Sequence, residues 1–430
     1  MHESASFPLW SVIPFVAMLL SIAVLPLVLP KLWHSNRNKL ALSVVISVPV
    51  LAILALHSQM TLLGHSMMEY FSFIVLLGAL FVISGGVHIR GAWAGTPLVN
   101  TTYLAVGAVL ANLIGTTGAS MLLIRPYLRA NRKRSRRTHL IVFFIFIVSN
   151  IGGLLTPLGD PPLFLGFLRG VPFFWTLHLL PQWAVAVGIL LVVFNLVDQK
   201  IFEKEDVETP GALIEDVQPK RKLQIDGKMN FLCLVGVMVA APLSAHFGWP
   251  HGVQESIMIL MGVISYFGTR KEVHKANHFD FEPIAEVAAL FLGIFVTMIP
   301  ALEILSQQSA HWKLDHAWQF FWMTGVLSSF LDNAPTYLTF TALASGHFGG
   351  NAQDLSLLLG NPLSEQMLRA ISCGAVFMGA NTYIGNGPNL MVKSIADQSG
   401  IKMPTFGGYL VYSGAVLVPL FLVITLIFFR

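Results

Sequence analysis

Charged residues are scarce in this chain of 430 residues. Lys, Arg, Asp and Glu make up 11% of it, against about a quarter in ordinary soluble domains. Hydrophobic residues make up 55%. So few charges could not cover the surface of a water-soluble enzyme, and the deficit therefore predicts an integral membrane protein.

Cysteine is nearly absent as well. Cys233 and Cys373 both lie inside apolar stretches, so the sequence offers neither a disulfide framework nor a cysteine metal site. The formal net charge of +4 is small, and its one dense basic cluster lies beside apolar stretches. We interpret that cluster as a topology signal and expect no nucleic acid partner. We expect no cofactor and no enzyme, since the apolar stretches lack nucleophile–base pairs and metal-ligand spacing.

Long apolar stretches fill most of the chain, and about 18 such residues suffice to span the hydrocarbon of a bilayer. The first stretch has no basic segment before it and no small-residue cleavage site, so we interpret it as a retained helix. The stretches lie near 9–29, 40–58, 67–86, 97–124, 138–168, 173–197, 229–246, 251–268, 283–306, 317–345, 367–398 and 405–429.

The placement of Lys and Arg predicts the orientation. These residues gather in four segments, 31–39, 125–137, 200–228 and 270–275. The positive-inside rule puts all four in the cytoplasm. This arrangement places both termini on the outer, periplasmic side of a bacterial inner membrane.

Stretch 97–124 is expected to enter and leave the membrane by the same face. The three spans before it end inside at Arg90, and the densest basic cluster follows it. Gly107, Gly115 and Gly118 favour a turn within it, which protein or a water-filled cavity must then satisfy. We therefore predict a re-entrant hairpin; the alternative is one ordinary crossing helix.

The second half is expected to repeat this order of elements in the opposite orientation across the membrane. A span at 283–306 precedes a second hairpin at 317–345, an interrupted span at 367–398 and a last helix. Between that hairpin and the interrupted span, residues 345–366 contain no Lys or Arg. The contrast with the basic cluster of the first half is what opposite orientations predict.

The predicted fold is an all-α polytopic membrane protein with about ten transmembrane helices, two re-entrant helical hairpins and two broken helices. Residues 1–197 form the first repeat and 229–430 the second, joined by a polar cytoplasmic linker at 198–228. Each half has an odd number of spans, which forces the inverted topology common among secondary transporters.

Helices 138–168 and 367–398 are interrupted at matching positions. The first contains Ser-Asn-Ile-Gly-Gly at 149–153 and Thr-Pro-Leu-Gly-Asp-Pro-Pro at 156–162, and the second Gly-Ala-Asn-Thr-Tyr at 379–383 and Gly-Asn-Gly-Pro-Asn at 385–389. Gly and Pro both weaken a helix. One interruption alone could be a structural kink, but paired interruptions indicate a midplane binding site. Freed carbonyls can bind a cation and helix N-termini an anion, so the breaks leave the sign of the ligand open.

Three acidic residues bear on whether the ligand is a cation or an anion. They are Asp160 in the first break, Asp332 at the second hairpin tip and Glu286 early in its span. A charged Asp at a helix centre costs roughly 2.5–3.5 kcal/mol. Because removal from water disfavours the charged carboxylate, a proton can compete there with a sodium ion. The structural alternatives are an Asx turn at Asp332, a Pro-Pro entry turn at Asp160 and an interfacial carboxylate at Glu286.

Neutral groups near the tips and breaks could complete an ion or substrate site. Each side chain could equally form a helix–helix hydrogen bond, which is the commoner use in bilayers. The candidates are Asn112, Thr116, Thr117, Ser120, Asn150, Thr156, Gly159, Asn333, Thr336, Asn381, Thr382, Asn386 and Gly387.

These segments resemble the ion transporter superfamily, in particular its NhaD-type sodium/proton antiporter and citrate transporter-like branches. The residues that match lie at 115–120, 150–162, 331–335 and 379–388, and the likeness covers nearly the whole chain. The resemblance implies a homodimer with a scaffold domain and an elevator-like transport domain. It also implies that hairpin tips and helix breaks together hold substrate and coupling ion.

The chain departs from the dicarboxylate-transporting relatives, which carry Ser-Asn-Thr at both tips. Here the tips read Gly-Thr-Thr-Gly and Leu-Asp-Asn-Ala-Pro. An Asp facing the site would repel a citrate-like anion by several kcal/mol in low dielectric. We therefore predict a sodium (cation)/proton antiporter with Asp160 and Asp332 as the competing site.

The alternative to the antiporter is a permease for a citrate-like organic anion or an arsenite-type oxyanion, coupled to sodium or protons. In that case helix termini and the polar tips hold the anion. A channel is a further possibility, but inverted repeats with broken helices favour alternating access.

Overall fold

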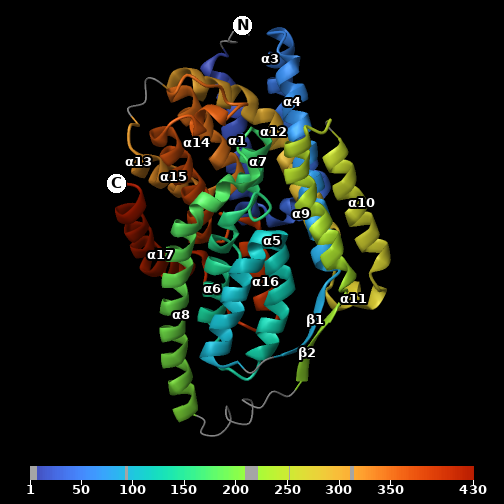
Figure 1. The fold of residues 1–430 in the computed structure, drawn as a ribbon, viewed down its shortest axis with the longest axis vertical. Helices are drawn as coiled ribbons and strands as arrows, with labels where there is room; N and C mark the ends of the chain where they lie inside the picture. Colours follow the sequence, from blue (N-terminus) through green and yellow to red (C-terminus); the bar gives the residue numbers. More distant parts are fainter. Residues whose placement is uncertain (1–6, 93–94, 209–220, 251, 310–313) are drawn as a thin grey trace.

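The computed structural model describes residues 7–92, 95–208, 221–250, 252–309 and 314–430 (Figure 1). These residues form an all-α polytopic membrane protein, as predicted. In the described ranges nine helices are long and apolar enough to cross a membrane. The chain forms helices α1 (Ile13–Val28), α2 (Pro30–Trp33), α3 (Asn36–Leu56), α4 (Met60–Gly85), α5 (Pro97–Ala130), α6 (Thr138–Ile147), α7 (Pro161–Leu168), α8 (Leu180–Glu208), α9 (Met229–Phe247), α10 (Val253–Gly268), α11 (Lys271–Ala276), α12 (Glu282–Gln308), α13 (Ala317–Phe330), α14 (Asn333–His347), α15 (Pro362–Met378), α16 (Gly387–Gln398) and α17 (Phe406–Phe428).

Helix α5 turns back on itself at Gly115, whose φ of 75° and ψ of 155° are not helical. Near the two ends of α5, Asn100 donates a hydrogen bond to Asn131 at 2.9 Å. The rings of Tyr103 and Tyr127 lie 5.6 Å apart. The two arms therefore run antiparallel, and the second arm extends to Ala130, beyond the boundary expected from the sequence.

The second pair of short helices, α13 and α14, is joined by Leu331 and Asp332 alone. In both halves of the chain the next helix is broken. Helix α6 gives way to a short 3-10 helix, η2 (Ile151–Leu155), before α7 begins, and α15 gives way to η7 (Gly379–Asn381) before α16 begins. Prolines in the first turn of α7 and of α16 help to restart each helix.

The segment at 198–228, which the sequence predicts to be a polar linker, contains regular structure in its described parts. Helix α8 continues to Glu208, and strand β2 (Arg221–Asp226) pairs antiparallel with β1 (His88–Ala92). Residues 209–220 of that linker lie outside the described residues. The strand pairing joins segments more than a hundred residues apart, so the polar composition of the segment gave no local signal for it.

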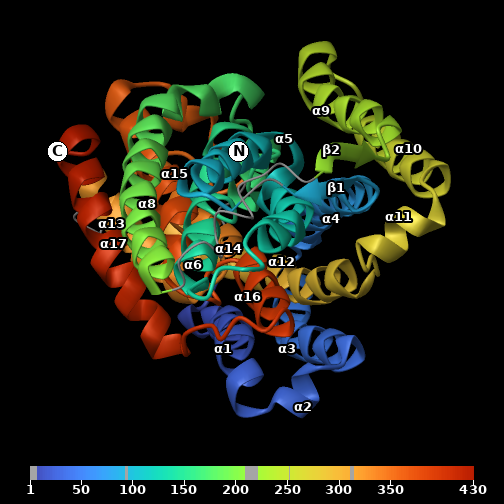
Figure 2. The same ribbon diagram turned by 90° about the horizontal axis from the view of Figure 1, so that it is seen from below.

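The helices pack as two groups. In the first, α3 packs on α12, and α10 packs on α4 and α9; in the second, α13 packs on α15, and α5 packs on α8 and α16. The groups meet where α12 contacts α14 and where α4 contacts α5. Figure 2 shows α9 to α11 on the side of the molecule opposite α8 and α17.

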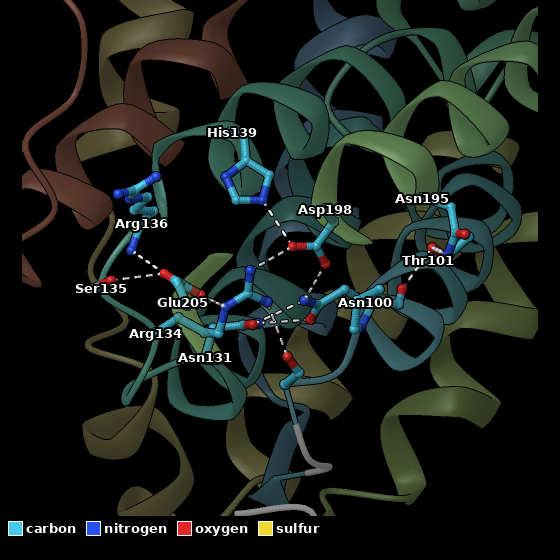
Figure 3. Close-up of polar contacts among 12 residues, drawn as sticks. Asn100, Thr101, Asn131, Arg134, Ser135, Arg136, His139, Asn195, Asp198 and Glu205 are labelled. Atoms are coloured by element: carbon cyan, nitrogen blue, oxygen red, sulfur yellow. Dashed lines mark hydrogen bonds and ion pairs between the residues drawn. The ribbon is translucent and has the colours of Figure 1, made fainter. Parts of the chain in front are cut away.

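A buried ion network fastens the base of α5 to α8 (Figure 3). Arg134 donates to Asp198 at 2.8 Å and pairs with Glu205. His139 contacts the same Asp198 oxygen at 2.9 Å, and Asn100 donates to the other oxygen at 2.9 Å. Each carboxylate in this network therefore has a cationic partner, so the network is compensated and stabilises the fold.

Candidate functional site

The first break positions Asp160 directly before α7. The loop that precedes it is closed by a hydrogen bond from the Gly159 amide to the Thr156 carbonyl at 3.0 Å. A Cβ at Gly159 would collide with the Gly153 carbonyl, so only glycine allows this close approach. The Asp160 side chain makes no capping bond to α7. Its carboxylate is thus free to receive donors from elsewhere.

Three side chains from three other segments converge on the Asp160 carboxylate, which is 1% exposed. Thr116, at the tip of α5, donates to Oδ1 at 3.1 Å, and Asn386, which precedes α16, donates to Oδ1 at 3.3 Å. Asn333, the first residue of α14, donates to Oδ2. Both hairpin tips and both breaks therefore meet at one acid.

No basic side chain balances this carboxylate. Across the described residues, no Lys or Arg forms a salt bridge with Asp160. Within the same part of the chain, no group of three or more His, Cys, Asp or Glu could hold a metal. A buried charge satisfied by neutral donors alone remains costly, in contrast to Asp198, which Arg134 compensates. The described residues therefore leave the charge of an ionised Asp160 without a cationic partner.

The tip of α5 is anchored to the first break by its backbone. The Thr116 amide donates to the Gly159 carbonyl at 2.9 Å. Asn112 accepts from the Leu155 amide at 2.7 Å, and its carbonyl accepts from the Thr156 hydroxyl. Asn112 and Thr156 thus hold the tip and the break together, away from the Asp160 carboxylate.

Two other candidates, Thr117 and Ser120, lie on α5 after its turn at Gly115. The Ser120 hydroxyl contacts that of Ser149 at 2.8 Å. Thr117 is half-buried and lines a cavity.

A chain of amides joins the two breaks. Asn150 donates to the Asn389 side chain at 2.7 Å and accepts from Asn386 at 3.2 Å. Asn389 in turn donates to the carbonyls of Gly379 and Thr382, both at 2.9 Å. Sequence reasoning did not select Asn389 as a ligand. The spacing of three between Asn386 and Asn389, which puts both on one face of the first turn of α16, was the available signal.

Ser329 of α13 is a second residue that the sequence did not select. It accepts from the Asn381 side chain at 2.9 Å, and its carbonyl accepts from Thr382. The Ser329 hydroxyl also donates to the Met378 carbonyl at 3.1 Å. This serine fastens the second hairpin to the second break.

Two buried amide oxygens at the site have no hydrogen-bond donor among the described residues: Asn333 Oδ1 and Asn381 Oδ1. Such orphaned acceptors are uncommon in folded proteins. The Asn333 oxygen belongs to the amide that contacts Asp160 through its nitrogen, so it lies beside the carboxylate. A carboxylate and a free amide oxygen are the kind of ligands that hard cations prefer.

Neither of the other two acids makes a hydrogen bond to Asp160 in the described part of the chain, although Asp332 lies close enough for its charge to act on Asp160. Asp332 is half-buried and accepts from the Ala334 amide at 3.0 Å, so it caps α14 as an Asx turn would. The Thr336 hydroxyl donates to the Asp332 carbonyl at 2.9 Å. Glu286 forms an ion pair with Lys39 of α3 at 2.7 Å. Gly387 is exposed.

A small cavity separates the tip of α5 and the first break from the first helix group. Its volume is about 80 Å³, and Thr116, Thr117, Leu80, Phe81 and Pro283 are among its lining residues. One water needs roughly 10–15 Å³ by this measure, so several waters fit. Pockets for drug-sized molecules start at about 300 Å³.

Paired helix breaks around a buried carboxylate, in a chain of many apolar helices, define a multi-pass membrane transporter. The chain belongs to the family described as "Putative citrate transport", whose model matches residues 4–429. It is similar to an uncharacterised transporter of Mycobacterium bovis, with 25% identity over 397 residues that cover 85% of this chain and 87% of the relative. An uncharacterised transporter of Mycobacterium tuberculosis matches with the same identity and coverage.

Proposed function

We propose that this protein is a secondary active transporter that exchanges a cation, sodium, for a proton at Asp160. One observation supports this choice above the others: a fully buried carboxylate receives three neutral donors and, among the described residues, no salt bridge. A bound cation or a proton would each remove the uncompensated charge. The two ligands therefore compete for one acid.

Exchange follows from the same electrostatics. The ionised Asp160 binds the metal ion, with Asn333 Oδ1 as a nearby neutral ligand. Protonation removes the charge and expels the ion. The site crosses the hydrocarbon at a low free-energy cost only when it is occupied by the ion or protonated, because a bare charge there costs several kcal/mol. Coupling then requires no direct contact between sodium and proton.

We further propose an elevator-like movement in which α5 to α8 and α13 to α17 slide against α1, α3, α4, α9, α10 and α12. The meeting of two packed groups along α12–α14 and α4–α5 supports this division. A homodimer in a bacterial inner membrane, with both termini outside, completes the proposal.

The second candidate is carriage of a citrate-like organic anion or an oxyanion, which the description of the matching family favours. In that case Asp160 would hold the coupling ion, and the anion would lie outside the small cavity beside the tip of α5. The uncompensated charge of Asp160 makes the antiporter the better fit to the site.

A proton-flux assay in reconstituted vesicles separates the two candidates. Vesicles with an imposed pH gradient are challenged in turn with sodium, lithium, potassium and citrate. We expect sodium or lithium to evoke proton movement and Asp160→Asn to abolish it. Asp397→Asn is the matched control, because Asp397 pairs with Lys393 on the exposed side of α16. Citrate-evoked flux without any cation response would refute the antiporter.

A further inference from the structure

A large cavity outside the candidate site lies where the β1–β2 sheet meets the start of α9, the end of α10 and α11 (Figure 1). Its volume is about 610 Å³. None of its lining residues lines the cavity beside Asp160. The volume falls within the roughly 300–1,000 Å³ typical of small-molecule sites.

The cavity carries an excess of positive charge. Arg90, Lys228 and Arg270 line it together with the acids Asp226 and Glu272. The Arg90 guanidinium pairs with Asp226 and holds the pKa of that carboxyl below its usual value. Among the described residues, neither Lys228 nor Arg270 forms a salt bridge. Arg270 is close enough to act electrostatically on Asp226, but in the described part of the chain neither cation is held by a carboxylate in a direct ion pair, so both can still bind an anion.

The floor of the cavity is a hydrogen-bonded framework. Asn230 is 1% exposed and donates to the Gly86 carbonyl at 2.7 Å and to Thr269 at 2.9 Å. Ser265 donates to the Asn230 oxygen at 2.5 Å. These bonds tie the ends of α4 and α10 to the start of α9. The basic side chains therefore project from a fixed base.

Exposed apolar side chains lie close in sequence to the basic residues that line the cavity. Leu232 of α9 is 73% exposed and Phe267 of α10 is 80% exposed. They lie within a few residues of Lys228 and Arg270, which line the cavity. Exposed apolar side chains on membrane helices face acyl chains, whereas the sheet beneath them is polar. The cavity therefore lies at the level where hydrocarbon ends and headgroups begin.

We propose that this cavity binds the phosphate headgroup of an anionic phospholipid, with Lys228 and Arg270 as the phosphate ligands. Basic pockets between membrane helices on the cytoplasmic side are suited to such headgroups, and the positive-inside rule places 200–228 and 270–275 on that side. A soluble phosphate ester offers the same anionic group. The adjoining apolar surface favours the lipid, since only a lipid has acyl chains to bury there.

Native mass spectrometry of the delipidated full-length protein tests the proposal. The probes are short-chain phosphatidylglycerol, phosphatidylcholine with the same chains, and glycerol phosphate. We expect phosphatidylglycerol to bind in preference to the other two. Each cation near an anionic headgroup contributes about fivefold in affinity. The Lys228→Gln/Arg270→Gln variant should therefore bind phosphatidylglycerol about 25-fold more weakly than the unmodified protein.

The matched control is Arg132→Gln/Lys402→Gln. It removes the same charge from exposed residues that follow α5 and α16, and it should leave the affinity unchanged. Equal losses in both variants would mean that net charge alone attracts the lipid and would overturn the site. Equal affinity for glycerol phosphate and phosphatidylglycerol would overturn the assignment to a lipid. Unaltered thermal unfolding of both variants establishes that they are folded.

Discussion

At the scale of single residues, charge compensation distinguishes the candidate site from the rest of the buried polar network. Asp198 and Asp160 are both buried, 0% and 1% exposed. Asp198 has Arg134 and His139 beside it, whereas the side-chain donors to Asp160 are Thr116, Asn333 and Asn386, all neutral. The Asp198 arrangement stabilises the fold by itself, whereas the charge of Asp160 is one that, under the proposed function, a cation or a proton would neutralise.

Asp332 allows its charge to be separated from its role as a helix cap. Asn caps a helix about as well as Asp, whereas Ala costs about 1 kcal/mol. Because the Asp332 carboxylate accepts from the Ala334 amide, we expect Asp332→Asn to keep stability and most sodium-evoked proton flux. Asp332→Ala should lower the unfolding free energy by about that 1 kcal/mol. Thermal unfolding and vesicle flux measure the two effects.

If Asp332→Asn abolishes flux as completely as Asp160→Asn while remaining folded, Asp332 itself holds the ion. The paired site expected from the sequence would then replace the single-acid site.

The sequence alone identified Asp160 and its three donors as candidates, because an acid and amides inside apolar stretches are rare enough to stand out. It did not select Asn389 or Ser329. The bond between Asn150 and Asn389 depends on how the two breaks fold against each other, and the bond between Thr382 and Ser329 depends on how α13 packs against the second break. The spacing of Asn386 and Asn389 places both on one face of α16 but does not identify these partners.

At the scale of elements, the two breaks are closed by glycines with the same spacing. Gly153 and Gly159 approach each other in the first, and Gly379 and Gly385 in the second. A Cβ at Gly385 would lie 2.6 Å from the Gly379 carbonyl oxygen, as well as close to the backbone of α13. The two breaks are therefore built alike although their side chains differ.

Gly385→Ala is expected to destabilise the protein by about 1–3 kcal/mol, the usual cost of overpacking, and to weaken sodium binding because the break must open. Gly387→Ala is the matched control, since no atom lies within 4 Å of its Cβ position. Thermal unfolding with and without sodium measures both variants. Equal stability of the two would show that the second break tolerates a side chain.

An ion pair joins the two helix groups. Arg169, at the end of α7, contacts Glu69 of α4 at 2.8 Å and donates to the Ala352 carbonyl at 2.9 Å. Removing one partner of a buried pair typically costs 3–5 kcal/mol because the other charge is left uncompensated. We therefore expect Glu69→Gln to destabilise the protein more than Glu69→Gln/Arg169→Gln does. Thermal unfolding of the single and double variants gives the coupling between them.

The exposed pair Lys393–Asp397 serves as the control, since surface pairs contribute about 0–1 kcal/mol. If Glu69→Gln is no more harmful than Asp397→Asn, the link between α4 and α7 is not a stabilising contact.

The turn in α5 and both helix breaks could be located from the sequence because Gly and Pro act locally. The end of α8 and the β1–β2 pairing could not. Glu205 belongs to a polar segment that the sequence assigns to the linker, yet it is 3% exposed and pairs with Arg134 of the connection between α5 and α6.

At the scale of the whole molecule, orientation rests on the positive-inside rule. It places the α3–α4 connection outside and the end of α16 inside. In a variant with Cys233 and Cys373 replaced by Ser, a membrane-impermeant maleimide should label His57→Cys in intact cells. Ser399→Cys should be labelled only after the membrane is permeabilised. Both positions are exposed, so access to the reagent depends on the side of the membrane.

Labelling of both cysteines from the same side would contradict the inverted arrangement of the two halves. It would leave the contacts around Asp160 intact but remove the argument for alternating access between the two faces.

The most direct test of the central claim is proton release from purified protein in weakly buffered detergent solution when sodium is added. If Asp160 exchanges a proton for a metal ion, sodium should release protons from the unmodified protein and from Asp397→Asn, choline should release none, and Asp160→Asn should be silent. Undiminished, sodium-specific proton release from a folded Asp160→Asn variant would contradict the account.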